Sequence, residues 1–296
     1  MAKRVFLFIL TNLAIVATLS IIVSVLGVSQ GYTADGGLNL GALALFCFIY
    51  GMGGAFISLQ ISRWIAKRAT GVQLVDGRTG NAELDWLHAT VRRLTQQANL
   101  PMPEVGVYNS PEVNAFATGP SKSRSLVAVS QGLMRGMRRE EIEGVLAHEV
   151  AHIANGDMVT MTLLQGVVNA FVMFAARVIA HVVTRSNDGR NGNGGMYFLI
   201  VIVLQIVLGI LGSLITSWFS RQREFRADHG GATLAGRDRM IAALRRLAVN
   251  RELVDPSHEA LATMKINGAG RWMVFFHTHP PLEARIAALE HYQRPM

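Results

Sequence analysis

The chain has 296 residues, 50% of them hydrophobic and only 16% charged. Soluble domains typically carry about 25% charged residues, so this composition excludes an ordinary soluble globular protein. The net charge is +8, but the sequence contains no nucleic-acid-binding module, so we attribute the basic balance to membrane topology. The single cysteine, Cys47, excludes disulfides within the chain and a cysteine-based zinc site.

Four apolar runs predict membrane-crossing helices. The runs are 5–28, 38–61, 158–176 and 196–220. Each is close to or longer than the roughly 20 residues that a helix needs to cross the hydrocarbon core. Any one run alone could be a buried core helix, but four in one chain favour a membrane protein. The first is too long for the apolar part of a cleaved signal peptide, so we expect an anchor. Arg177 and His181 follow the third, so the last two runs either cross fully or form a re-entrant pair.

Basic residues flank the first two runs on their outer sides. They are Lys3 and Arg4 before the first run, and Arg63, Lys67 and Arg68 after the second. The connecting segment 29–39 contains no Lys or Arg. The positive-inside rule therefore places the N-terminus and the residues after 61 in the cytoplasm. Arg185 and Arg190, between the third and fourth runs, argue weakly against this orientation.

The remaining residues fall into two polar blocks, 62–157 and 221–296. Apolar residues at helical spacing predict helices over 81–99, 238–250 and 282–292. Three short strands are predicted over 104–108, 113–118 and 125–130, separated by turn-forming residues. The pattern indicates a small α+β domain, divided by the last two apolar runs.

The pentapeptide 148–152, His-Glu-Val-Ala-His, carries the strongest chemical signal. On a helix, positions i and i+4 share a face, so His148 and His152 can bind one zinc ion. Glu149 lies beside them and can take a proton from a water molecule at the metal. The alternative is an ordinary helix with two histidines by chance, but the acidic helix start at 139–147 favours the metal site.

A catalytic zinc site with two histidines needs a third protein ligand, and we assign it to Glu224. Asp228 lies one helical turn further on, where it can accept the distal N–H of a zinc-bound histidine. The alternative is a routine surface helix. The third and fourth runs separate His152 from Glu224 in the sequence. These two residues can bind one zinc ion only if they lie on the same side of the membrane, so the chain between them must cross the membrane twice or not at all. An intramembrane site is excluded because the charged residues 138–143 would lie at bilayer depth.

In these motifs the chain resembles the HtpX-type heat-shock membrane proteases, which are relatives of the CAAX prenyl proteases among the zinc metallopeptidases. The likeness covers nearly the whole length. It rests on the N-terminal hairpin, Asn-Ala-Phe-Ala-Thr-Gly at 114–119, the segments 148–157 and 224–228, and Thr-His-Pro-Pro at 278–281.

The resemblance implies one Zn²⁺ per chain, held by His148, His152 and Glu224. It also implies Glu149 as the general base and a supporting role for Asp228. By similarity to the prenyl proteases, His279 and Arg285 are candidate donors to the oxyanion. The alternatives are a helix N-terminal residue for His279, and an exposed or salt-bridged residue for Arg285. Asn114, on a strand that could pair with an extended substrate, is a candidate substrate contact.

We therefore predict an α+β zincin-like metalloprotease domain on a polytopic α-helical membrane anchor of about four transmembrane helices. Its predicted parts are a transmembrane hairpin (1–61), the first half of the protease domain (62–157), a transmembrane or re-entrant hairpin (158–220) and the second half (221–296). The expected function is cleavage of damaged or misfolded membrane proteins and unfolded polypeptides at the bacterial cytoplasmic (inner) membrane, with the zinc domain facing the cytoplasm. The alternatives are a non-catalytic, zinc-stabilised membrane scaffold and a processing protease for specific lipidated substrates.

Overall fold

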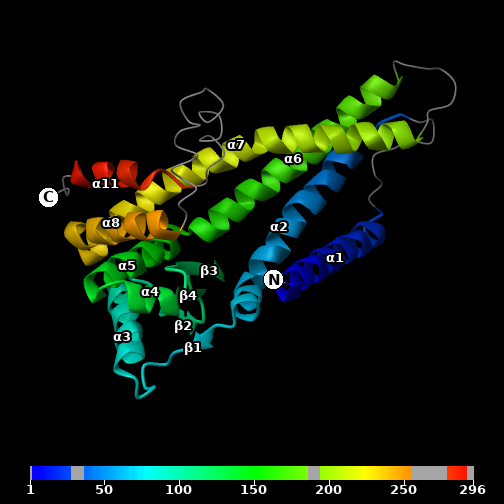
Figure 1. Cartoon of the computed structure of the whole chain (residues 1–296). Coiled ribbons are helices and arrows are strands. Elements are labelled where there is room, and N and C mark those ends of the chain that lie inside the picture. The colour runs from blue at the N-terminus through cyan, green and yellow to red at the C-terminus, as the bar shows by residue number, and fades with distance from the viewer. Residues whose placement is uncertain (1, 28–36, 186–193, 255–278, 292–296) are drawn as a thin grey trace. The chain divides into compact units, whose positions relative to one another are not determined.

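The computed structural model describes residues 2–27, 37–185, 194–254 and 279–291 (Figure 1). These residues form two units. The first unit comprises Met1–Leu59 and Thr160–Thr216, and the second comprises Gln60–Val159 and Ser217–Met296.

The first unit is built from long apolar helices. Its helices are α1 (Ala2–Val25), the first part of α2 (Leu40–Thr70), most of α6 (Asp157–Arg185) and the first part of α7 (Gly194–Ala235). Among the described residues, α2, α6 and α7 contain stretches long and apolar enough to cross a membrane. The corresponding apolar stretch of α1 is shorter, Leu13–Val25, so the fourth crossing stays a prediction.

Small residues allow the helices of this unit to approach closely. A Cβ atom at Gly51 of α2 would lie 2.6 Å from the backbone nitrogen of Ala170 in α6, a distance that no side chain tolerates. Beside this contact, Leu43 and Cys47 are buried against Met173 of α6. Helices α2 and α6 are therefore packed backbone to backbone.

The second unit contains a four-stranded mixed sheet. Its strands are β1 (Gln73–Leu74), β2 (Glu104–Tyr108), β3 (Ala115–Ser121) and β4 (Arg124–Ser130), in the order β1-β2-β4-β3. β2 and β4 are parallel, whereas β1 and β3 pair antiparallel with their neighbours. β3 therefore forms one edge of the sheet. Gly119 occupies its bulge with φ of 146°, and a Cβ there would collide with the Arg124 carbonyl oxygen.

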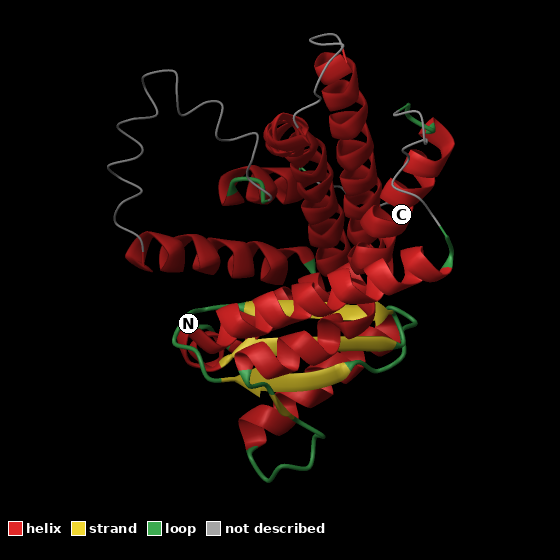
Figure 2. Cartoon of the chain, turned by 90° about the vertical axis from the view of Figure 1, so that its right-hand side faces the viewer, coloured by secondary structure: helices red, strands yellow, loops and turns green. Residues whose placement is uncertain are grey.

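Helices α3 (Ala82–Gln97), α4 (Gln131–Gly136) and α5 (Arg139–Asn155) pack against the sheet and cover its core (Figure 2). α8 (Arg237–Val254) packs on α5, the end of α7 adds Ala235 to the core, and α11 (Leu282–Glu290) packs on α8. Val127 and Val129 of β4 point into the core with α3 and α5, whereas Leu126 and Ala128 pack on the other side of the sheet. The central residues 126–129 of β4 are thus buried on both faces, which explains why all four are apolar.

Most of the predicted elements are confirmed. The strand 104–108 is confirmed in full, and the predicted helix 81–99 is α3, whose N-cap Asn81 accepts hydrogen bonds from the backbone N–H groups of Glu83 and Leu84. β3 begins two residues later than predicted, at Ala115, because the backbone of Asn114 is held by Ser130. Two short elements, β1 and α4, were not predicted.

Helix α7 does not end with the apolar run 196–220. It continues to Ala235, so the acidic residues Glu224 and Asp228 stand on the helix that carries the last apolar run. The helix needs no break there because no glycine or proline interrupts residues 213–229.

Candidate metal centre

Helix α5 presents the two histidines of the pentapeptide. Glu141 caps its N-terminus by accepting a hydrogen bond from the backbone N–H of Arg138 at 2.8 Å, and Gly156 ends it in the left-handed conformation. His148 and His152 lie one turn apart with Nε2 atoms separated by 3.0 Å. The two residues are 8% and 9% exposed, so α5 holds them buried and aimed at one point.

Helix α7 brings Glu224 to the same point. Its Oε2 lies 3.5 Å from His148 Nε2, and its Oε1 lies 3.5 Å from His152 Nε2. Gly231 makes this approach possible, since a Cβ there would lie 3.1 Å from the backbone nitrogen of His148. Two segments that are far apart in the sequence thus meet at one cluster.

The cluster fits a tetrahedral metal ion. One ligand atom from each of His148, His152 and Glu224 lies within 4.8 Å of the other two. Metal–ligand bonds of about 2.0–2.2 Å at tetrahedral angles place ligand atoms roughly 3.3 Å apart, close to the 3.0 and 3.5 Å found here. Two imidazoles and one carboxylate suit a borderline metal such as zinc better than calcium or magnesium.

Each histidine has a carboxylate behind it. Asp228 Oδ1 lies 2.9 Å from His148 Nδ1, and Asp157 Oδ2 lies 2.7 Å from His152 Nδ1. An ionised carboxylate only accepts hydrogen bonds, so it keeps the proton on Nδ1 and leaves the Nε2 lone pair for the metal. The sequence placed Asp228 in this role. It missed Asp157, although that residue follows His152 by little more than one turn.

These carboxylates also stabilise the charged imidazoles. Burial disfavours the charged form of His152, but hydrogen bonds to Asp157 and Glu224 outweigh it and raise the pKa of His152 to about 9. For His148, burial is likewise outweighed by the hydrogen bonds to Asp228 and Glu224, and its pKa is raised. The negative charge of these carboxylates therefore strongly favours a proton or a metal cation at the Nε2 atoms.

Arg285 is buried, with 6% exposure. It comes from α11, where Leu289 packs on Met240 and Leu244 of α8. Its Nε and Nη2 donate hydrogen bonds of 2.7 and 2.6 Å to the two oxygens of Asp228. The structure shows the salt bridge that the sequence offered as one alternative: Arg285 holds the Asp228 carboxylate that contacts His148. The role of Arg285 as an oxyanion donor stays a prediction.

His279 remains close to the cluster. Its Nδ1 lies 3.0 Å from Glu224 Oε2, while its side chain is 62% exposed. It stands directly before Pro280 and Pro281, at the start of α11. An exposed imidazole beside the ligand carboxylate can still turn toward a bound substrate.

A small cavity of about 140 Å³ opens onto the cluster. Glu149 and Asn114 line it, together with His148, Glu224, His279 and Arg285. Its other wall is apolar and comes mainly from α8, with Met240, Leu244 and Leu247. All of the predicted site residues except Asp228 and His152 therefore line this one cavity.

Asn114 can contact a ligand only through its side chain. Its backbone N–H donates to Ser130 Oγ at 3.1 Å, and its carbonyl oxygen accepts from the Ser130 N–H at 2.9 Å. The side chain is exposed at the start of the edge strand β3.

Comparison with known proteins identifies the family of the chain. The model of peptidase family M48 matches residues 81–293. The Protease HtpX of Idiomarina loihiensis is 50% identical over 289 residues, which cover 97% of this chain and 99% of that protein. The Protease HtpX homolog of Thiobacillus denitrificans is 52% identical over 292 residues, covering 98% of this chain and 100% of that protein. The chain belongs to peptidase family M48.

The predicted resemblance to the HtpX-type proteases is thereby confirmed, and this M48 chain is a metalloprotease. Its relatives are bacterial and three of its described helices are apolar enough to cross a membrane, so it is a bacterial membrane protein. The fold is also similar to the crystal structure of S. mikatae Ste24p, with a TM-score of 0.62 and 18% identity. That alignment covers 98% of this chain and 66% of the other, and at this identity it supports the fold alone.

Asp157 offers a test of the carboxylates in this M48 chain. We expect Asp157→Asn to weaken zinc binding by about 10–100-fold, since a neutral amide holds the Nδ1 proton of His152 less firmly. Competition with a chromophoric chelator measures the affinity. Asp238→Asn is the control, because the Asp238 side chain is 98% exposed on α8. Equal affinities of the two variants would show that Asp157 does not support the metal ligand.

Proposed function

We propose that this chain is a zinc-dependent endopeptidase of the bacterial cytoplasmic membrane that cleaves damaged or misfolded membrane proteins. One observation carries the proposal: Glu149 lines the same cavity as His148 and Glu224, whose ligand atoms with those of His152 have the spacing of a tetrahedral site. A structural metal site has no use for a partly exposed carboxylate between its two histidines.

His148, His152 and Glu224 would hold the metal. Zinc held there would supply Lewis-acid chemistry, polarising the attacking water and the scissile carbonyl. Glu149 takes the proton of the attacking water and returns it to the leaving amine. His279, exposed beside Glu224, is the proposed donor to the developing oxyanion. Arg285 keeps its guanidinium on Asp228 and acts through His148, as a positioning residue.

The substrate backbone is proposed to pair with the edge strand β3. An edge strand offers unpaired backbone groups to an extended peptide, and β3 begins directly after Asn114 at the cavity. The Asn114 amide then contacts the substrate. The apolar wall formed by Met240, Leu244 and Leu247 accepts an apolar side chain next to the cleaved bond.

Removal and return of the metal test this function. Full-length protein purified in detergent with zinc should hydrolyse unfolded casein. A chelator should abolish the hydrolysis, and a stoichiometric amount of zinc should restore it, with fragments followed on gels. Casein that stays intact with zinc at one ion per chain would contradict the proposal, as would hydrolysis that persists after all metal has been removed.

We further propose that the second unit faces the cytoplasm. Arg63 and Lys67, which lie in this unit and form ion pairs with Glu104, follow the second apolar run and meet the positive-inside rule. In a Cys47→Ala chain, single cysteines at Ser123, Asp238 and Asp35 should respond differently to a membrane-impermeant thiol reagent. In a strain whose outer membrane admits the reagent, only the Asp35 position, which lies outside the described residues, should react in intact cells. Reaction of Ser123 or Asp238 in intact cells would reverse the proposed orientation.

A further inference from the structure

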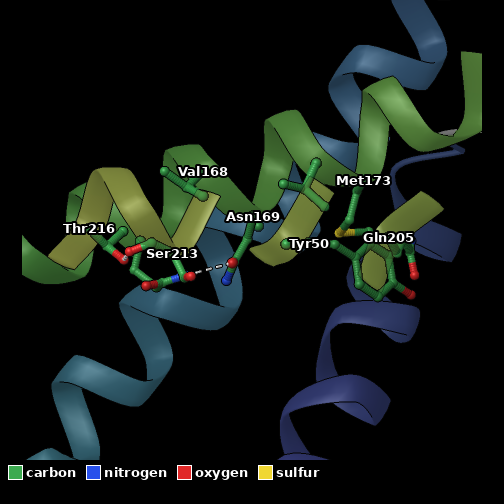
Figure 3. A pocket seen from close by; sticks show the side chains of 11 residues that line it. Tyr50, Val168, Asn169, Met173, Gln205, Ser213 and Thr216 are labelled. Carbon is green, nitrogen blue, oxygen red and sulfur yellow. Dashed lines mark hydrogen bonds between the residues drawn. The ribbon is translucent and has the colours of Figure 1, made fainter. Parts of the chain in front are cut away.

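Polar side chains gather at one place within the apolar helices of the first unit. Gln165 and Asn169 come from α6, Gln205 and Ser213 from α7, and Tyr50 from α2. They line a groove of about 340 Å³, in which Asn169 and Ser213 lie near one another while Tyr50 and Gln205 stand at the other end (Figure 3). All the lining residues belong to this unit.

The groove lies within the predicted membrane span. The membrane-crossing stretch of α6 is Asp157–Thr184, and Asn169 lies roughly 18 Å along the helix from Asp157, near the middle of a hydrocarbon core of about 30 Å. At that depth no water is available to form hydrogen bonds with primary amides, so exposing these side chains to lipid is unfavourable. Gln165 and Asn169 are nevertheless exposed on the surface of the unit.

Much of the hydrogen-bonding capacity in the groove is unused. Gln165 donates from Nε2 to Asn169 Oδ1 at 2.8 Å, which leaves the other amide protons of this pair and the Gln165 oxygen available. Gln205 makes no hydrogen bond to any described residue. Ser213, in contrast, donates to the carbonyl oxygen of Ile210 in its own helix at 2.7 Å. The three amides are therefore the groups that can bind a ligand.

The wall formed by α7 is shaped for close contact with another helix. Gln205, Gly209 and Ser213 recur every fourth residue and so share one face of α7. A Cβ atom at Gly209 would meet nothing within 4 Å, so the space in front of it is open. Small residues spaced by four let the backbones of two membrane helices approach and form hydrogen bonds between them.

No segment of this chain can fill the groove as a further membrane helix. The sequence has four long apolar runs, and α1, α2, α6 and α7 already contain all of them. Many of the large side chains that these helices expose are apolar, among them Phe48, Phe171 and Ile206, but Gln165 and Asn169 are exposed as well. A second copy of the chain would therefore meet the groove mainly with its own Gln165 and Asn169, and the experiment below distinguishes this pairing from substrate binding.

We propose that this groove binds a transmembrane helix of the substrate that carries a polar side chain. A purely apolar helix gains no hydrogen bond by leaving lipid for the groove, whereas a helix with an unpaired polar group does. Helices with unpaired polar groups in lipid mark membrane proteins that are damaged or have lost their partner subunits. The groove thereby selects substrates, an inference that rests on the proposed function.

Photocrosslinking in membranes tests the proposal without requiring hydrolysis. The full chain with Glu149→Gln carries a benzophenone amino acid in place of Val172, which lines the groove. The probe is a single-span membrane protein with Asn at mid-span, compared with the same protein carrying Leu. We expect about fivefold more crosslinking to the Asn probe, the ratio that corresponds to one hydrogen bond in a membrane.

Three leucine substitutions then remove the amides. The chain with Gln165→Leu, Asn169→Leu and Gln205→Leu should crosslink both probes equally, whereas Val167→Leu, on an exposed position of α6 outside the groove, should keep the preference. Equal crosslinking of both probes to the chain with its amides intact would overturn the proposal. So would crosslinks that join two copies of the chain or reach only lipid. Crosslinking does not require hydrolysis. A failure of the proposed protease function would therefore leave the preference for the Asn probe unchanged, whereas a failure of the groove proposal would abolish it.

Discussion

The chain with Glu149→Gln is expected to bind one zinc ion and to hydrolyse no detectable casein. The three ligands stay in place, whereas an amide cannot take a proton from water, and general acid–base catalysis contributes about 10²–10⁴-fold to such reactions. The full-length variant should also survive purification better than the original, because a membrane-bound protease meets its own chain at high effective concentration. Metal content by mass spectrometry and fragment formation on gels measure the two effects.

The same variant separates the remaining interpretations of the chain. Glu140→Ala, on the exposed first turn of α5, is the matched control and should cleave casein normally. Casein hydrolysis by Glu149→Gln at the control rate would remove Glu149 from the mechanism. If neither chain cleaves casein but the control cleaves lipidated peptides, the processing protease is correct.

The local part of the site could be predicted from the sequence because helix geometry fixes it. His148 and His152 are one turn apart, and Glu224 and Asp228 are one turn apart, so each pair shares a helix face whatever the tertiary fold. The structure brings these two faces together, with the spacing of a tetrahedral site. The strands 104–108 and 125–130 could also be predicted from a local pattern, because each is a short apolar run bounded by turn-forming residues.

Other features depend on contacts that no local pattern encodes. Arg285 lies beyond a segment outside the described residues, and only the packing of α11 on α8 buries it against Asp228. Asp157 begins α6, and its role depends on the turn at Gly156 that aims it back at His152. The polar groove is a third case: Gln165 and Gln205 are single polar residues in apolar runs, and only the pairing of α6 with α7 places them together.

The loss of Glu224 should have the second large effect. We expect Glu224→Ala to weaken zinc binding by more than about 100-fold, beyond the effect of removing a carboxylate that only supports a ligand. Hydrolysis should disappear with the metal. Glu224 is 1% exposed and lies within 3.5 Å of both histidines, so no water-exposed carboxylate can replace it without moving α7.

Glu283→Ala is the matched control, because Glu283 is an exposed carboxylate on the first turn of α11 and lines no part of the cavity. It should keep about one zinc ion per chain during dialysis against a chelator. Glu224→Asp provides a second comparison: the carboxylate remains but is one methylene shorter, so zinc binding should be intermediate between that of Glu224→Ala and the original chain. Stoichiometric zinc in Glu224→Ala after the same dialysis would mean that the third ligand lies elsewhere, and the contact between α5 and α7 would then be structural.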